Sequence, residues 1–443
     1  MEHYSVLYLP VGVATFDMQY AQQLFEESRT MLLELYKDVI CPPEILLSPK
    51  ALSVFLQDKR PNLIILQNVT FANAAYAAEV IGHKDVPLVL WTLREPISGG
   101  GRLRLNSLTG AFSAANRLYI GWFGRFEYVY GNPKEVRAQL KTLLRVSKLC
   151  YQLKHLRLAQ IGYTPAGFGF GRASDEDMLQ HFGVHLESIE IRQLIAHANA
   201  YSPAELEEER VRVHKAICGL ERIPKENMDG FLRLLKAYTD YVHAENIGAL
   251  ASRCWPDYFT DYGTPVCAVL GMLNDDGIAA SCEADAYGAL SMYVGMQLSE
   301  MPVFFGDPVS VDEVQNTMTF WHCGTAACSL SREDTGACAG LHCNRGIGPT
   351  LDFGCKPAPN ATVFRIGRKA DGHFRMYVQK GEILDAPKQF VGTSIVVKLE
   401  QSVRDILEQS IYAGWEPHFV VAYGDISEEL RILSQMQQLE LSC

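Results

Sequence analysis

The sequence lacks several features that would place the protein in a well-defined class. No apolar run approaches the roughly 18 residues of a membrane-spanning helix. The first residues, MEHYSVLYLPVGVATF, have neither the basic start nor the cleavage site of a secretory signal, and they predict a first strand. Basic residues are outnumbered, with 40 Lys and Arg against 51 Asp and Glu and a net charge of −11. We therefore expect a cytoplasmic protein whose partners include neither a membrane nor a nucleic acid.

Common catalytic signatures are also missing. The chain has no P-loop and no GxSxG elbow. The turn GFGFGR at 167–172 has the spacing GxGxG, which is not the GxGxxG of a dinucleotide site. Twelve scattered cysteines do not indicate a disulfide scaffold. Instead they predict mostly buried thiols, such as Cys218 and Cys267, in a reducing compartment.

What the sequence does contain predicts a mixed α/β fold in three parts. Short apolar runs such as NLIILQ and PLVLW alternate with helical segments, which predicts a Rossmann-like α/β domain over residues 1–152. A second such domain is predicted for 153–299, with PVCAVLGMLND interpreted as a strand and a helix starting near Glu283. Residues 300–443 hold β-rich runs separated by Gly, Pro and Asp, which predicts a barrel-like C-terminal domain.

Two carboxylates and a histidine are the first candidates for chemistry. Glu283 opens the apolar helical run EADAYGALSM, and Asp307 follows the strand-like run MPVFF at a Gly-Asp-Pro turn. His418 stands far along the chain at the start of the apolar strand HFVVAY. Hard oxygen ligands and an imidazole suit a divalent cation. Local pattern alone leaves ordinary alternatives open, namely a Glu at a helix N-terminus, an Asp in a turn and a core histidine.

A stretch rich in His and Cys, HCGTAACSLSREDTGACAGLHCNRG, runs from His322 towards Cys355. Thiolates and imidazoles at short spacing could bind zinc or an iron–sulfur cluster. The gaps are wider than the Cys-x2-Cys pairs of a zinc ribbon. We therefore interpret the stretch as the wall of a tight pocket in which His322 or His342 contacts substrate hydroxyls, and the role of its cysteines stays open.

Arginines gather in the loop WTLREPISGGGRLRLNSLTG, which holds Arg94, Arg102, Arg104 and Asn106 beside three consecutive glycines. With Arg172, these side chains could bind an anionic group on a substrate. Solvated arginines on a structural loop are an equal alternative. The hypothesis assigns substrate contacts to Arg102, Asn106 and Arg172.

Four segments together resemble the L-fucose isomerase/L-arabinose isomerase superfamily, on the fucose isomerase side. They are EADAYGALSM, FFGDP, WHCG and GWEPH. The resemblance covers most of the chain, although the chain is shorter than typical fucose isomerases. It implies that Glu283, Asp307 and His418 hold one divalent ion, usually manganese, and that the two carboxylates are the catalytic groups. It also implies a homo-oligomer, a hexamer or trimer, with active sites between subunits.

The activity implied by the resemblance is aldose–ketose isomerisation of a hexose or related sugar through a cis-enediol intermediate. An anionic sulfo- or phospho-sugar and a 6-deoxy sugar are the options for the substrate, and which carboxylate is the base stays open. Two other functions also stay open. One is a non-catalytic sugar-binding or sensing protein, since α/β domains flanking a cleft serve both purposes. The other is a Cys/His-based metalloenzyme that uses residues 322–355.

Overall fold

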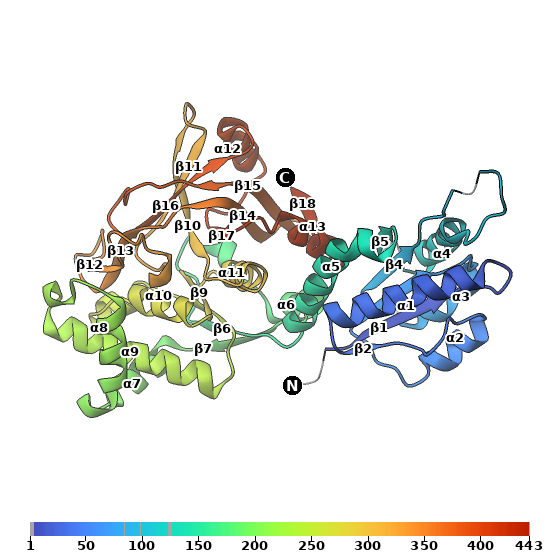
Figure 1. Cartoon of the computed structure of the whole chain (residues 1–443). Coiled ribbons are helices and arrows are strands. Elements are labelled where there is room, and N and C mark those ends of the chain that lie inside the picture. The colour runs from blue at the N-terminus through green and yellow to red at the C-terminus, as the bar shows by residue number, and fades with distance from the viewer. Residues whose placement is uncertain (1–3, 84, 98, 123–125, 443) are drawn as a thin grey trace. The chain divides into compact units, whose positions relative to one another are not determined.

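A computed structural model describes residues 4–83, 85–97, 99–122 and 126–442. It divides the chain into two units (Figure 1). The first unit runs to Gln152 and includes Gln435–Gln437, whereas the second comprises Leu153–Ser434 and continues from Gln438. None of the helices in the described part of the chain has the length and apolarity that a membrane span requires.

The first unit is an open parallel sheet with the order β2-β1-β3-β4-β5. Its strands are β1 (Val6–Val11), β2 (Val39–Ile40), β3 (Leu63–Asn68), β4 (Leu88–Thr92) and β5 (Glu127–Tyr130). Its helices are α1 (Met18–Leu35), α2 (Pro49–Leu56), α3 (Ala74–Val80), α4 (Ser107–Trp122) and α5 (Pro133–Leu153). Every residue of β1, β3 and β4 is buried, as continuous apolar runs predict for strands covered on both faces.

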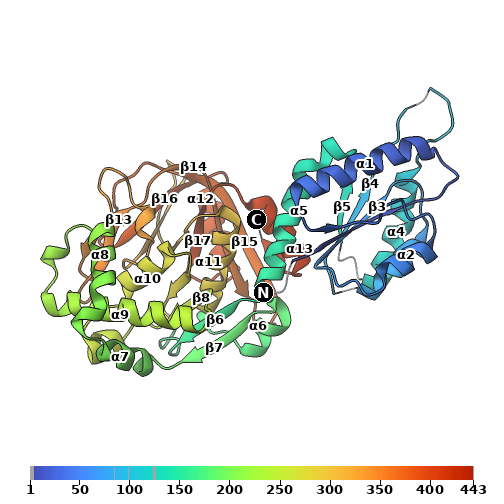
Figure 2. The ribbon, with the colours of Figure 1, turned by 60° about the horizontal axis from the view of Figure 1, so that its bottom comes forward.

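The second unit begins with another parallel sheet, of order β7-β6-β8-β9. Its strands are β6 (Arg157–Ile161), β7 (His185–Ile189), β8 (Ala249–Ser252) and β9 (Ala279–Cys282). The helices are α6 (Asp175–Phe182), α7 (Ile191–Ala200), α8 (Glu207–Ala216), α9 (Lys225–Ala244), α10 (Cys267–Asp275) and α11 (Ala286–Ser299). Helices α7 and α9 pack side by side (Figure 2). The parallel sheets confirm the mixed α/β fold with Rossmann-like units.

The rest of the second unit is a barrel of the order β16-β11-β10-β17-β14-β15, closed by pairing of β15 with β16. Its strands are β10 (Phe304–Asp312), β11 (Thr317–His322), β14 (Ala358–Arg368), β15 (Phe374–Ile383), β16 (Thr393–Leu399) and β17 (Phe419–Tyr423). Further elements are β12 (Cys338–Gly340), β13 (Thr350–Gly354), β18 (Glu440–Ser442), α12 (Val403–Tyr412) and α13 (Ser427–Met436). The barrel-like prediction is confirmed.

The parallel sheet and the barrel of the second unit share one hydrophobic core. Buried residues of β6, β8, α9 and α10 belong to the same cluster as buried residues of β10, β11 and β17. The predicted boundary between residues 299 and 300 lies inside this unit, and the predicted domain boundaries stay predictions. Short 3₁₀ or π turns complete the chain at Ile81–His83, Gly169–Gly171, Pro203–Leu206, Leu220–Arg222, Tyr258–Tyr262 and Cys328–Leu330.

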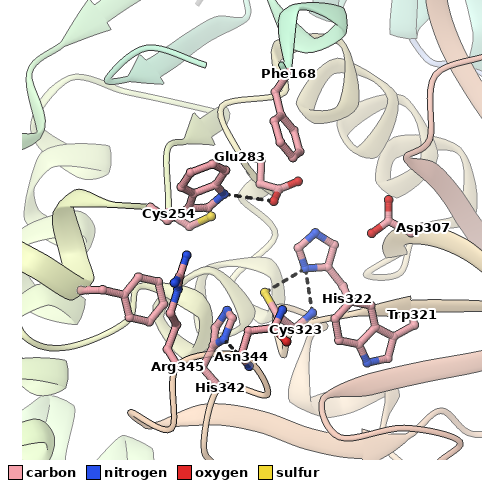
Figure 3. A pocket seen from close by; sticks show the side chains of 12 residues that line it. Phe168, Cys254, Glu283, Asp307, Trp321, His322, Cys323, His342, Asn344 and Arg345 are labelled. Carbon is pink, nitrogen blue, oxygen red and sulfur yellow. Dashed lines mark hydrogen bonds between the residues drawn. The ribbon is translucent and has the colours of Figure 1, made fainter. Parts of the chain in front are cut away.

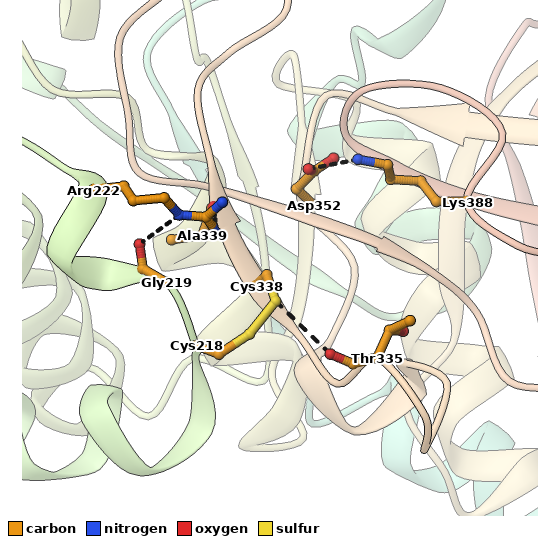
Figure 4. The surroundings of a disulfide bond; sticks show 8 residues. All are labelled: Cys218, Gly219, Arg222, Thr335, Cys338, Ala339, Asp352 and Lys388. Atoms are coloured by element: carbon orange, nitrogen blue, oxygen red, sulfur yellow. Dashed lines mark hydrogen bonds and ion pairs between the residues drawn. A yellow bond between two sulfur atoms is a disulfide. The ribbon is translucent and has the colours of Figure 1, made fainter.

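Three local expectations are wrong. The segment PVCAVLGMLND forms helix α10, whose residues Cys267–Asn274 are all buried, so that no polar face revealed its helical period. Asp307 lies within β10 opposite Trp321, because the strand continues through the Gly-Asp-Pro sequence and becomes irregular only after Pro308. Cys218 is not a free thiol but forms a disulfide with Cys338, 120 residues away (Figure 4).

Candidate active site

Glu283, Asp307 and His418 converge in the second unit. Nε2 of His418 lies 3.1 Å from Oε2 of Glu283 and 3.6 Å from Oδ1 of Asp307. Glu283 directly follows β9, at the carboxyl end of the parallel sheet, where ligands of α/β folds usually bind. Asp307 on β10 and His418 just before β17 are brought together because these two strands pair, with Gly306 opposite Phe419.

The backbone at Glu283 adopts an unusual conformation. Glu283 and Ala284 have φ values of 59° and 52°, a region that non-glycine residues seldom occupy and that clusters at functional sites. The turn is fixed by a hydrogen bond from the Ala284 N–H to the Ser252 carbonyl (3.0 Å). The Trp255 indole N–H donates to the Glu283 carboxylate (3.4 Å). Glu283 therefore lies in a hydrogen-bonded turn, three residues before α11 begins at Ala286.

A buried ion pair orients His418. Asp285 accepts two hydrogen bonds from Arg365, of 2.8 and 3.1 Å, and lies 2.9 Å from Nδ1 of His418. Arg365 also donates to the His418 carbonyl (2.8 Å). Burial alone would raise the pKa of Asp285, but Arg365 and His418 hold it well below its usual range. Because Asp285 is thus an ionised acceptor, Nδ1 of His418 is the donor and Nε2 faces the two site carboxylates.

The pKa shifts of His418 and Asp307 show that the space between them and Glu283 has a negative electrostatic potential, which favours a cation. Burial lowers the pKa of His418, but Asp285 and Glu283 outweigh it, so that the net shift is upward. Burial, aided by the nearby Glu283, raises the pKa of Asp307. Nε2 of His418 is buried and has no well-aligned hydrogen-bond partner. Glu283, His322 and His418 each place one ligand atom within 4.8 Å of the others. Asp307 lies beside this group, with Oδ1 3.6 Å from Nε2 of His418. Such oxygen and imidazole donors suit a divalent cation.

Glu283 and Asp307 line a cavity of about 250 Å³ (Figure 3). Aromatic side chains form much of its wall, which suits the apolar faces of a sugar ring or chain. The lining residues are Phe168, Cys254, Trp255, Phe259, Glu283, Asp307, Trp321, His322, Cys323, His342, Asn344 and Arg345.

Both predicted substrate-binding histidines line this cavity. Nδ1 of His322 accepts a hydrogen bond from the Cys323 N–H (3.0 Å), which places the ring proton on Nε2. That nitrogen is buried, has no other partner among the described residues, and faces the space between Glu283 and Asp307 in Figure 3. His322 is close enough to Glu283 and His418 to be a further metal ligand, but its protonated Nε2 suits donation to a substrate hydroxyl.

The predicted arginine and asparagine contacts are not part of this cavity. Arg102 and Asn106 belong to the first unit, whereas every lining residue belongs to the second. Arg102 donates to the Thr15 carbonyl, and Arg172 in the second unit donates to Thr164 Oγ1 (3.3 Å). Substrate contacts by Arg102, Asn106 and Arg172 stay predictions.

Thiols lie in the cavity wall and behind it: Cys323, from the predicted His/Cys stretch, lines the cavity, whereas Cys267 and Cys282 do not. Sγ of Cys323 is 3.6 Å from Sγ of Cys267 and 3.2 Å from Nδ1 of His322. Cys282, next to Glu283 in sequence, groups with Cys323 and His322. The stretch 322–355 does not assemble as one set, because Cys338 is used in the disulfide. The metalloenzyme alternative would therefore need cysteines that the sequence interpretation left out.

Sequence reasoning missed several residues of the site. Asp285 stands two positions after Glu283 in EADAYG, and Arg365 interrupts the apolar run ATVFRIG, which is an unusual place for a charge. Arg345 lies within the quoted His/Cys stretch, two residues after Cys343 in HCNRG. Each of these signals is present in the sequence, but only the fold shows where the side chain lies.

Comparison with known proteins gives full-length relatives, whereas no family model matches the chain. The chain is 54% identical over 442 residues to a sulfoquinovose isomerase of Clostridium sp. (strain MSTE9), covering 99% of both chains. It is 37% identical over 447 residues to a sulfoquinovose isomerase of Priestia megaterium, again covering 99% of both. A third relative of the same name, from Alkalicoccus urumqiensis, is 35% identical over 440 residues and 98% of both chains.

Proposed function

Because the chain belongs to the sulfoquinovose isomerase family, a family of aldose–ketose isomerases, we propose that it interconverts sulfoquinovose and the corresponding 2-ketose. Sulfoquinovose is a 6-deoxy hexose with a sulfonate on C6. The reaction moves a proton between C2 and C1 and a second proton between O1 and O2. The observation that carries the proposal is that Glu283 and Asp307 line an aromatic-walled cavity and both lie close to Nε2 of the oriented His418.

We further propose that Glu283, Asp307 and His418 hold one divalent cation, with manganese as the preferred ion. The support is the donor set itself, in which His418 is oriented by Asp285 and its Nε2 has no well-aligned partner among the described groups. When bound, the cation supplies Lewis-acid stabilisation of the negative charge that develops on O1 and O2.

The side chains of the cavity account for the proton transfers. Glu283 and Asp307 flank the same space, so an open-chain sugar with C1 and C2 there would meet both carboxylates. One carboxylate takes the proton from C2 and returns it to C1, and the other moves the hydroxyl proton between O2 and O1. The His322 Nε2–H would donate to a substrate hydroxyl and so fix the orientation of the chain.

Metal-loaded protein is expected to convert sulfoquinovose in heavy water into a ketose that carries deuterium on C1. The base exchanges its proton with solvent between the two transfers, which produces the label. NMR at C1 and C2 measures conversion and labelling together. After dialysis against a chelator the conversion should stop, and added Mn²⁺ should restore it. A fully chelated protein that still isomerises, with no manganese, zinc or iron by elemental analysis, would contradict the metal proposal.

A homo-oligomer, a trimer or hexamer, is also proposed, because α4 of the first unit exposes large apolar side chains. Phe112, Tyr119 and Ile120 are 74%, 68% and 62% exposed, and such clusters mark protein interfaces. Light scattering of the native protein is expected to show the assembly, and Phe112→Asp combined with Ile120→Asp should reduce its mass. The exposed Val314 in the turn after β10 provides the control Val314→Asp. Native protein that is monomeric at micromolar concentration would argue against the oligomer.

A further inference from the structure

The charges that line the cavity are distributed unevenly. Glu283 and Asp307 place two carboxylates at the C1–C2 position proposed above. Arg345 is the one arginine or lysine among the described lining residues. In Figure 3, Arg345 and Asp307 lie on opposite sides of the cavity, with His342 and Asn344 on the side of Arg345. The cavity therefore has an acidic side and a side that carries a guanidinium.

The Arg345 guanidinium forms no ion pair with a carboxylate among the described residues. It packs over the Phe259 ring, 5.8 Å from its centre. Two arginines of the glycine-rich loop, by contrast, form ion pairs: Arg94 with Glu135 (3.2 Å) and Arg104 with Asp17 (2.8 Å). An arginine that faces a cavity without a counter-ion is available for an anionic ligand.

The turn that carries Arg345 is closed by its own backbone hydrogen bonds. The His342 N–H donates to the Ile347 carbonyl (2.8 Å), and the N–H groups of Arg345 and Gly346 donate to the His342 carbonyl (3.1 and 2.8 Å). The Asn344 N–H donates to Nδ1 of His342 (3.3 Å). These bonds fix the backbone from which the exposed Arg345 side chain extends, so that binding has to order the side chain but not the turn.

We propose that Arg345, assisted by the Asn344 side chain, forms the subsite that binds the C6 sulfonate. This inference rests on the proposed function and names the residue that would make the enzyme specific for a sulfonated sugar. C1 and C6 are the two ends of an open-chain hexose, so a substrate with C1 and C2 at the carboxylates directs C6 towards the opposite side. The planar guanidinium donates in parallel to two sulfonate oxygens. It also offsets the repulsion between an anionic substrate and the acidic side of the cavity.

Arg345→Gln tests the subsite by comparing sulfoquinovose with the neutral 6-deoxy sugar quinovose. Loss of a charged hydrogen bond is expected to lower kcat/KM for sulfoquinovose about 10- to 100-fold, mainly through KM. The value for quinovose should change less than about 2-fold, because that sugar has no anionic group. Arg345→Lys keeps the positive charge but not the two parallel N–H donors of the guanidinium. Its kcat/KM for sulfoquinovose should therefore lie between those of Arg345→Gln and the native protein. The exposed Arg404 on α12 provides the matched control Arg404→Gln.

Each other outcome has a definite meaning. An equal loss for both sugars would overturn the inference, because Arg345 would then support the cavity and not the sulfonate. Unchanged kinetics for sulfoquinovose in Arg345→Gln would also overturn it, while the turnover itself would leave the proposed function standing. Native protein that isomerises quinovose but not sulfoquinovose would instead refute the proposed substrate, whatever the variant does. Turnover of quinovose by Arg345→Gln shows that the variant is folded.

Discussion

Glu283→Gln is expected to lower kcat for the isomerisation about 100- to 10,000-fold, the contribution of a positioned acid–base group. The amide has nearly the same shape but cannot take a proton, and it brings no negative charge to the point that His418 and Asp307 share. The fold should be unaffected, because the Gln amide oxygen can still accept from the Trp255 indole N–H. Rates from NMR, with a melting curve of the variant, test both parts.

The control for this prediction is Glu313→Gln, which removes an exposed carboxylate from the turn after β10. It should keep the native rate, so that a general effect of lower charge is excluded. A Glu283→Gln variant that keeps more than about a tenth of the native kcat would mean that Glu283 is neither a catalytic group nor an essential ligand. The same variant should bind Mn²⁺ more weakly, which equilibrium dialysis measures independently of turnover.

Much of the fold could be predicted because buried parallel strands carry a plain signal. The apolar runs LIIL and LVLW are continuous, and both belong to strands buried on both faces. The same rule failed at α10, since a fully buried helix has no polar residues to show its period. It failed at Asp307 for a different reason. Gly-Asp-Pro usually marks a turn, but pairing with β11 keeps the chain extended there.

The site was harder to predict because it depends on long-range contacts. Glu283, Asp307 and His418 were candidates from the sequence itself, but only family resemblance joined them in one site. The strand pairing of β10 with β17 that brings two of them together is not visible in the sequence. The arginine hypothesis started from a glycine-rich loop that lies in the first unit, whereas the arginine at the cavity is Arg345. Composition can suggest an anionic substrate, but only the fold selects which cation faces the cavity.

The buried charges around Arg365 lead to the second large effect. Arg365 and Asp285 are 1% and 0% exposed, and Glu416 lies 3.7 Å from Arg365 Nε. Arg365→Met would leave Asp285 buried without its cation, at a cost of about 3–5 kcal/mol. We expect the melting temperature to fall by roughly 6–20 °C. The control Arg404→Met breaks an exposed pair with Glu408 (3.4 Å) and should shift it by less than about 2 °C. A melting temperature of Arg365→Met within about 2 °C of the native value would contradict the prediction.

A double variant separates the stability of this network from its role at the site. Replacing Arg365 by Met and Asp285 by Leu removes both buried charges, so the variant should regain much of the stability that Arg365→Met loses. Its His418 nevertheless has no acceptor for Nδ1, and the ring is no longer held with Nε2 towards Glu283 and Asp307. Mn²⁺ affinity should therefore stay about 10- to 100-fold below native, the usual cost of losing such a partner. If dialysis showed native affinity in the double variant, Asp285 would serve the fold alone and would not position His418.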